Sequence, residues 1–185
     1  MSNNILVVVN PQNDYVEGTM STPESKNVVP TIKRVIETSI DYEDDIFVVL
    51  DSHEGDYKNS PEGRHDKKPH CIIKTEGWKI YDEILQKLNE CSVDKINMVQ
   101  KKTFGSLDLV KKIKDCVKAS KDTIRNITLV GYHTDVDVLN NAILLKNNFK
   151  DIAITIKKNG CSGSSSQMSD AVYKLCETNH INVSI

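Results

Sequence analysis

The chain has no strong excess of charge of either sign, no long apolar run and no closely spaced pair of cysteines. Its 24 lysines and arginines nearly balance its 26 aspartates and glutamates, and the net charge of −2 argues against nucleic acid or a membrane surface as a partner. No apolar run is long enough to cross a bilayer. The first ten residues, MSNNILVVVN, lack the basic start and apolar core of a signal peptide. We therefore predict a soluble, cytoplasmic protein.

Cysteine usage is consistent with that compartment. The five cysteines include no CxxC pair, and their number is odd. This favours reduced thiols in a cytosol over a framework of disulfides. Cys161, in the segment KNGCSG (158–163), is interpreted as a loop or core cysteine rather than a nucleophile, because no His–Asp pair lies near it in the sequence.

Short apolar runs alternate with amphipathic segments along the whole chain. The apolar runs predict strands at 5–9, 46–50, 95–100, 127–130, 151–156 and 181–185, of which the first, second and fourth are expected to be buried. Apolar residues at helical spacing predict helices at 26–40, 78–88, 107–117, 137–148 and 164–179. The alternation predicts a three-layer α/β/α fold with a mostly parallel sheet of about six strands. No repeat or linker divides the chain, so residues 1–185 are expected to form a single domain.

Polar residues stand where the predicted strands end, which is where parallel α/β sheets bind their ligands. Asn10, Asp51 and Lys101 follow or end three of these strands, and a further turn follows Val130. Taken alone, Asn10 is compatible with a turn former and Lys101 with a surface charge. Asp137 suits the first turn of a helix because of the helix dipole, and it is also a natural partner for a lysine inside a pocket.

A polar loop after the second predicted strand carries carboxylate and imidazole groups. Asp51 and His53 are two residues apart and therefore share one face of an extended chain. Glu62, His65 and His70 follow in the same loop. Carboxylate and imidazole ligands together suit zinc, iron or manganese, so the loop is a candidate site for a divalent metal. A solvated polar loop is the alternative.

Five segments of the chain stand out as a set. They are NPQNDY (10–15), DSH (51–53), EG and HC with the following KTEGW (62–78), KKTFGS (101–106) and GYHTDVDV (131–138). In this order and spacing they resemble the motifs of the isochorismatase-like cysteine hydrolases, the group that includes nicotinamidases. The resemblance covers nearly the whole chain and implies the isochorismatase-like hydrolase fold. It further implies metal ligands at Asp51, His53, Glu62 and His70, a small-molecule ligand, and assembly as a homo-oligomer.

The chain departs from that family at two of the three positions its chemistry uses. The family's reaction requires a cysteine thiolate as nucleophile, an aspartate that relays a proton, and a lysine. Here Asp137 stands at the nucleophile position and Asn10 at the aspartate position, and only Lys101 remains. The resemblance also implies an oxyanion site at the nucleophile turn, around His133 and Val136, often beside a cis peptide. Because a carboxylate attacks amides poorly and an amide relays no proton, we expect the standard hydrolysis to be lost.

Three functions remain open from the sequence. The first is a pseudoenzyme or binding protein that keeps the pocket, and the metal, for a small amide, carboxylate or nucleotide-derived ligand. The second is an active hydrolase that uses Asp137 as an acid toward a vinyl ether, or a metal-activated water toward an amide. The third is an oligomeric scaffold.

Overall fold

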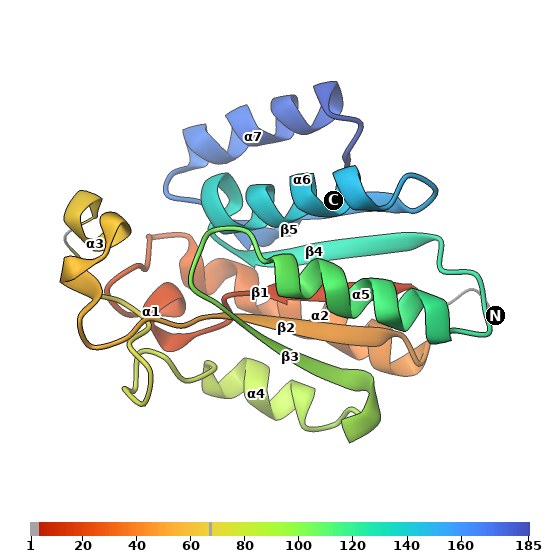
Figure 1. Ribbon diagram of the computed structural model, residues 1–185, viewed down its shortest axis with the longest axis horizontal. Helices are drawn as coiled ribbons and strands as arrows, with labels where there is room; N and C mark the ends of the chain where they lie inside the picture. The colour runs from red at the N-terminus through yellow and green to blue at the C-terminus, as the bar shows by residue number, and fades with distance from the viewer. Residues whose placement is uncertain (1–3, 67) are drawn as a thin grey trace.

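The computed structural model of the protein describes residues 4–66 and 68–185 (Figure 1). Within these ranges, six strands form one sheet in the order β3-β2-β1-β4-β5-β6, and every neighbouring pair is parallel. The strands are β1 (Ile5–Val9), β2 (Asp45–Asp51), β3 (Ile96–Lys101), β4 (Asn126–Tyr132), β5 (Ala153–Ser162) and β6 (Asn182–Ser184). The predicted three-layer fold is confirmed, with a sheet that is wholly rather than mostly parallel.

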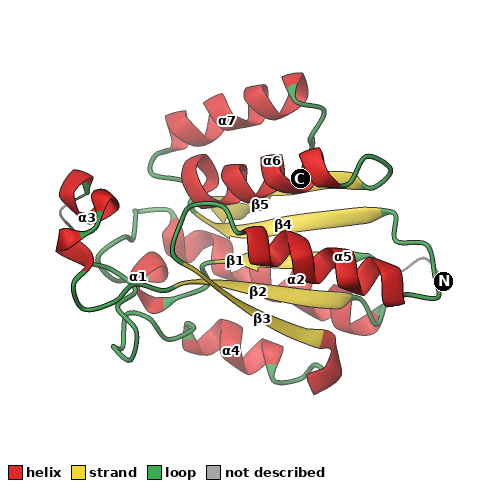
Figure 2. Ribbon diagram, viewed as in Figure 1, coloured by secondary structure: helices red, strands yellow, loops and turns green. Residues whose placement is uncertain are grey.

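Helices cover both faces of this sheet (Figure 2). The α-helices are α1 (Asn13–Val16), α2 (Val29–Asp41), α3 (Pro61–His65), α4 (Asp82–Leu88), α5 (Leu107–Ala119), α6 (Leu139–Asn148) and α7 (Ser166–Thr178). Short 3-10 turns lie at η1 (Ser25–Val28), η2 (Tyr57–Asn59) and η3 (Val93–Lys95), and a π-helical turn, η4 (Thr134–Val138), precedes α6. None of the helices in the described ranges is long and apolar enough to span a membrane.

Two apolar cores follow from the alternation of side chains along the strands. In β1, Ile5, Val7 and Val9 pack with α5, α6 and α7, whereas Leu6 and Val8 pack with α2 and α4. All five residues are buried, because a parallel strand between two helical layers has no solvent face. This is the physical reason why the run ILVVV is apolar throughout.

Three predicted boundaries are corrected by the structure. The helix predicted from residue 78 begins at Asp82, because Ile80 pairs with Gln12 in an antiparallel bridge. The fifth strand continues to Ser162 instead of ending at 156, since its last residues pair with the end of β4 beyond a shift of register. The helix predicted from residue 137 begins at Leu139, after the π-helical turn.

Cys161 therefore lies in β5, within the core shared with α7. Burial raises the pKa of its thiol to about 12. A buried, protonated thiol is a structural group and not a nucleophile, which agrees with the interpretation from sequence.

Candidate functional site

The carboxyl ends of four adjacent strands meet at one edge of the sheet. Lys101, the last residue of β3, is the register partner of Asp51 in β2. Asn10 follows β1 directly, and Asp137 lies in the π-helical turn after β4. Lys101 Nζ lies 2.5 Å from Asp137 Oδ1 and 3.2 Å from Asp51 Oδ1. The sheet thus joins groups that are far apart in sequence into one buried cluster.

The charged groups of this cluster stabilise one another's ionised forms. Burial disfavours the charge of Lys101, but Asp137 and Asp51 outweigh burial and raise the pKa of the ammonium. Burial also disfavours the Asp51 carboxylate, yet Lys101, His53 and His70 keep the pKa of Asp51 well below its usual value. Two buried carboxylates therefore share a single ammonium.

Asp51, His53 and His70 form a group with the geometry of a metal site. Their ligand atoms all lie within 4.8 Å of one another, and all three residues are buried. The Nε2 atom of His53 is buried without a directed hydrogen bond, although Asp51 Oδ1 is 3.2 Å away. Nδ1 of His70 donates to the carbonyl of Lys68 at 2.9 Å, which directs the free Nε2 toward Asp51. This donor set fits a divalent ion.

The fourth residue expected to bind metal, Glu62, stands slightly apart. Its Oε1 is 3.8 Å from His53 Nε2 and 4.0 Å from His70 Nε2, and α3 carries it at the cavity wall. Burial raises the pKa of Glu62. The structure thus gathers three of the predicted ligands and places the Glu62 carboxylate beside the two histidines.

Two tyrosines support the metal-type cluster and were not predicted. Tyr15 donates a hydrogen bond to Asp51 Oδ2 at 2.9 Å. The ring of Tyr57 packs edge-on against His53 and His70, with centroids 4.6 and 5.1 Å away. Tyr15 is the last residue of the first motif, NPQNDY, which is a usable signal, whereas nothing in the sequence marks Tyr57.

Gln12 and Asp14 brace the loops around these ligands. The Gln12 side chain accepts from the Asp51 amide at 2.8 Å and donates to the carbonyls of Asp51 and Trp78. Asp14 accepts from the amide of Cys71 at 2.7 Å, next to the ligand His70. The first motif, which follows β1, therefore positions the loop that follows the neighbouring strand β2.

The turn after β4 has an unusual backbone. The peptide bond between Tyr132 and His133 is cis. The His133 ring donates to the carbonyl of Met20 at 2.8 Å, and burial lowers the pKa of His133. The amide of Val136 donates to the His133 carbonyl at 3.2 Å. The oxyanion role of His133 and Val136 stays a prediction.

Asn141 joins this turn to the loop after β3. Its side chain donates to the carbonyls of Asp137 at 2.7 Å and Phe104 at 3.1 Å, and accepts from the amide of Ser106 at 3.0 Å. By contrast, the side chain of Asp135 accepts from the amide and hydroxyl of Ser164. The two aspartates of the turn therefore have different partners: Asp137 pairs with Lys101 in the buried cluster, and Asp135 bonds to Ser164.

Asn10 is the least satisfied residue of the site. It is fully buried and has a φ of 48°, a conformation that asparagine tolerates better than most residues. Neither Oδ1 nor Nδ2 has a hydrogen-bond partner within the described protein. Such orphaned groups are rare in a folded interior, and they indicate a place where water or a ligand completes the bonding.

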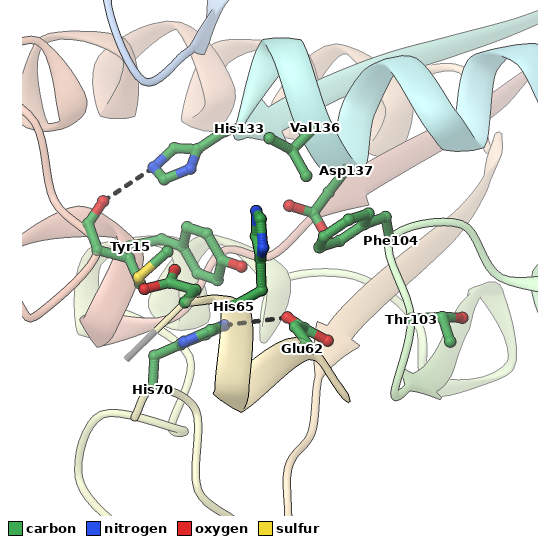
Figure 3. Close-up of a pocket in the computed structure, with 11 residues that line it drawn as sticks. Tyr15, Glu62, His65, His70, Thr103, Phe104, His133, Val136 and Asp137 are labelled. Atoms are coloured by element: carbon green, nitrogen blue, oxygen red, sulfur yellow. Dashed lines mark hydrogen bonds and ion pairs between the residues drawn. The ribbon is translucent and has the colours of Figure 1, made fainter. Parts of the chain in front are cut away.

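A cavity of about 450 Å³ opens above this cluster (Figure 3). Its lining includes the Asp137 carboxylate and the rings of Tyr15, Phe104 and His133. The other described residues of the wall are Met20, Glu62, His65, Asp66, His70, Thr103 and Val136. Its volume suits a small organic molecule.

The profile of the isochorismatase domain matches residues 4–183, and the chain therefore belongs to the isochorismatase family, as its motifs indicated. Nicotinamidases and amidases are among the solved structures similar to it. The nicotinamidase/pyrazinamidase of Bacillus subtilis superposes with a TM-score of 0.86 at 21% identity, over 99% of this chain and 100% of that one.

Two further structures extend the likeness. The zinc complex of the pyrazinamidase of Pyrococcus horikoshii has a TM-score of 0.78 at 15% identity, over 98% of both chains. The N-carbamoylsarcosine amidase of Thermoplasma acidophilum has a TM-score of 0.74 at 21% identity, over 98% of this chain and 95% of that one. At such identities the likeness establishes the fold. No curated protein sequence matches the chain significantly.

Zinc is expected to stabilise the protein through the Asp51–His53–His70 cluster. An ion that binds only the folded state at 100 times its dissociation constant adds about 2.7 kcal/mol to stability. Thermal unfolding with and without zinc measures the gain. His70→Ala removes a ligand and is expected to abolish most of it. His65→Ala, which removes a cavity histidine outside the cluster, is the control and is expected to retain it. An equal gain in wild type and His70→Ala would show that zinc binds elsewhere.

Proposed function

We propose that this protein binds a small molecule and a divalent ion in the cavity and has lost the cysteine-dependent hydrolysis of its family. One observation carries the proposal. At the position where the motifs place a thiolate nucleophile, Asp137 forms a buried ion pair with Lys101 at 2.5 Å. A carboxylate held by an ammonium is a weak nucleophile toward an amide carbonyl, because its charge is already stabilised.

No cysteine in the described protein stands in for the missing nucleophile. Cys71 follows the ligand His70, but it is fully buried, and burial with the nearby Asp51 raises the pKa of its thiol. Cys161 lies in the core of β5. A thiol attacks efficiently only as the thiolate, which both environments oppose.

The proton relay is also missing. Asn10 follows β1, where the family motif has an aspartate, and its amide group neither accepts nor returns a proton at neutral pH. Its unpaired Oδ1 and Nδ2 remain suited to hydrogen bonding. Asn10 therefore cannot replace the aspartate of the family in relaying a proton.

The proposed divalent ion is zinc, iron or manganese, because all three accept imidazole and carboxylate ligands. Asp51, His53 and His70 would hold the ion, with Glu62 as the fourth residue beside the two histidines. When bound, the ion supplies a Lewis acid for a lone pair of the ligand. Zinc in the pyrazinamidase structure of Pyrococcus horikoshii supports this choice.

Metal-dependent hydrolysis without a thiol is the second candidate. It is favoured by Glu62, a carboxylate beside the two histidines and on the cavity wall, where it can accept a proton from water. The alternative in which Asp137 acts as an acid is disfavoured by its ion pair with Lys101.

Ammonia release from nicotinamide and pyrazinamide, measured with the zinc-loaded protein, tests the proposal. No release above that of Asp137→Ala is expected. The zinc-loaded wild-type protein is nevertheless expected to bind the same amides, as measured by calorimetry. The double variant Asn10→Asp with Asp137→Cys restores the family's groups and is expected to regain measurable release. Release by the wild type that disappears in His53→Ala would instead establish the metal-dependent hydrolase.

A further inference from the structure

We infer that the cavity, when it holds no metal ion, selects a planar ligand with a positively charged nitrogen group, such as an amidine, over an isosteric carboxylate, and that Asp137 makes this choice. The inference rests on the proposed function, since it names the class of ligand that the cavity binds. It follows from the charges on the wall, the free oxygen of Asp137 and the shape of the apolar surfaces.

Carboxylates are the permanently ionised side chains of the cavity wall, which also carries the imidazole rings of His65, His70 and His133. Glu62, Asp66 and Asp137 line it, and no lysine or arginine does so among the residues that the structure describes. Lys101, the nearby cation, is buried and is already bonded to Asp137 and Asp51. Poor solvation inside a cavity strengthens the effect of unbalanced charge. A carboxylate ligand would therefore meet repulsion that an ammonium or amidinium would not.

The Asp137 carboxylate presents a hydrogen-bond acceptor to the ligand. Its Oδ1 receives the bond from Lys101, and Oδ2 receives none from the described residues. The side chain is only 3% exposed, and it lies among the groups that line the cavity (Figure 3). A carboxylate oxygen accepts hydrogen bonds but donates none. A ligand with N–H groups satisfies it, and a second carboxylate cannot.

The rest of the wall favours a flat body behind that nitrogen group. Tyr15 and Phe104 contribute aromatic rings, and Met20 and Val136 contribute aliphatic surface. Aromatic faces attract cations as well as flat rings. A cationic group on a small ring matches both the walls and the charge.

The position of this charge matters because the family's motif has a thiol there. Asp137 instead presents two carboxylate oxygens, and Lys101 bonds only one of them. The substitution thus does more than remove a nucleophile. It places a hydrogen-bond acceptor for a bound ligand at the end of β4.

Benzamidine, benzamide and benzoate test the inference, because they share one ring and carry charges of +1, 0 and −1. Their dissociation constants are measured by calorimetry on the whole protein with a chelator present, so that no metal ion offsets the carboxylates. Benzamidine is expected to bind at least ten times more tightly than benzoate, with benzamide between them. Asp137→Asn, which keeps the shape and removes the charge, is expected to reduce that ratio at least tenfold.

Asp135→Asn is the matched control, since it removes the same charge from the same turn but at a side chain bonded to Ser164. It is expected to keep the wild-type order. Asp137→Cys serves as a second variant at the position and is expected to behave as Asp137→Asn does. Unfolding temperatures of all variants confirm that they are folded.

Three results would overturn the inference: benzoate binding as well as benzamidine, no binding by any probe, or an unchanged ratio in both Asp137 variants. These results differ from failure of the proposed function. Tight benzoate binding without turnover contradicts the charge selection and leaves a binding protein. Ammonia release from benzamide contradicts the proposed function, and the measured order of affinities still decides the inference.

Discussion

Replacing Lys101 with methionine is expected to lower the free energy of unfolding by about 3–5 kcal/mol, the usual cost of leaving a buried charge without its partner. Lys101 is the ammonium that both Asp51 and Asp137 contact, and its side chain is 2% exposed. Methionine preserves most of the volume, so the loss reports on charge rather than packing. Urea unfolding, followed by circular dichroism, measures it.

The neighbouring residue supplies the control for this substitution. The Lys102 side chain is 66% exposed and pairs with the exposed Glu54, so Lys102→Met is expected to change stability by less than about 0.5 kcal/mol. Adding Asp137→Asn to Lys101→Met removes one of the two abandoned carboxylates and is expected to restore part of the loss. A cost below about 1 kcal/mol for Lys101→Met would mean that the carboxylates take up protons or water without penalty.

Gly131→Ala is expected to cost more than about 4 kcal/mol or to prevent folding, because two separate mechanisms act at this position. Gly131 has a φ of 123°, which L side chains rarely adopt. A Cβ atom there would lie 2.0 Å from the carbonyl oxygen of Val9 in the adjacent strand. Neither strand can withdraw without breaking the sheet next to the site. Soluble yield and urea unfolding provide the measurement.

Gly55→Ala is the matched control within the same chain. Nothing lies within 4 Å of a Cβ atom built at Gly55, so this change is expected to be close to neutral. A Gly131→Ala protein as stable as Gly55→Ala would show that the end of β4 can adopt another backbone. It would then no longer be fixed by its contact with Val9.

The strands and their polar ends could be predicted because short apolar runs bounded by polar residues are typical of buried strands in an α/β chain. The grouping of Asp51, Lys101 and Asp137 followed from the same reasoning, since the ends of neighbouring parallel strands share one edge of the sheet. The structure confirms the fold and places the three side chains in one cluster. Helical spacing also located α2 and α5 to within a few residues.

Predictions failed where contacts distant in sequence override local pattern. Trp78 and Ile80 have helical spacing with later residues, but the Trp78 indole donates to Ser52 at 2.8 Å and Ile80 pairs with Gln12. The polar, glycine-containing end of β5 resembles a loop, yet Cys161 pairs with Gly131 in β4. Tertiary pairing decides both segments, and a single sequence does not display it.

Within the site, sequence reasoning found the ionisable groups more readily than those that hold them. Gln12 and Asn141 act through hydrogen bonds to backbone groups, and Tyr57 acts through ring contacts with His53 and His70. Their residue types carry no special signal, because glutamine, tyrosine and asparagine are common in surface loops. Only the geometry of the folded chain assigns them a role.

Asn141 also limits how the cavity can move. Its side chain donates hydrogen bonds to the carbonyls of both Phe104 and Asp137, and so it holds these two parts of the cavity wall together. A larger guest cannot widen the space by separating them without breaking buried hydrogen bonds. Any change in the width of the cavity must therefore come from another part of the wall. Glu62 and His65 form that part, and both belong to α3, which lies outside the sheet. Tolerance for ligand size is therefore decided in α3, while the charge of the ligand is decided at Asp137.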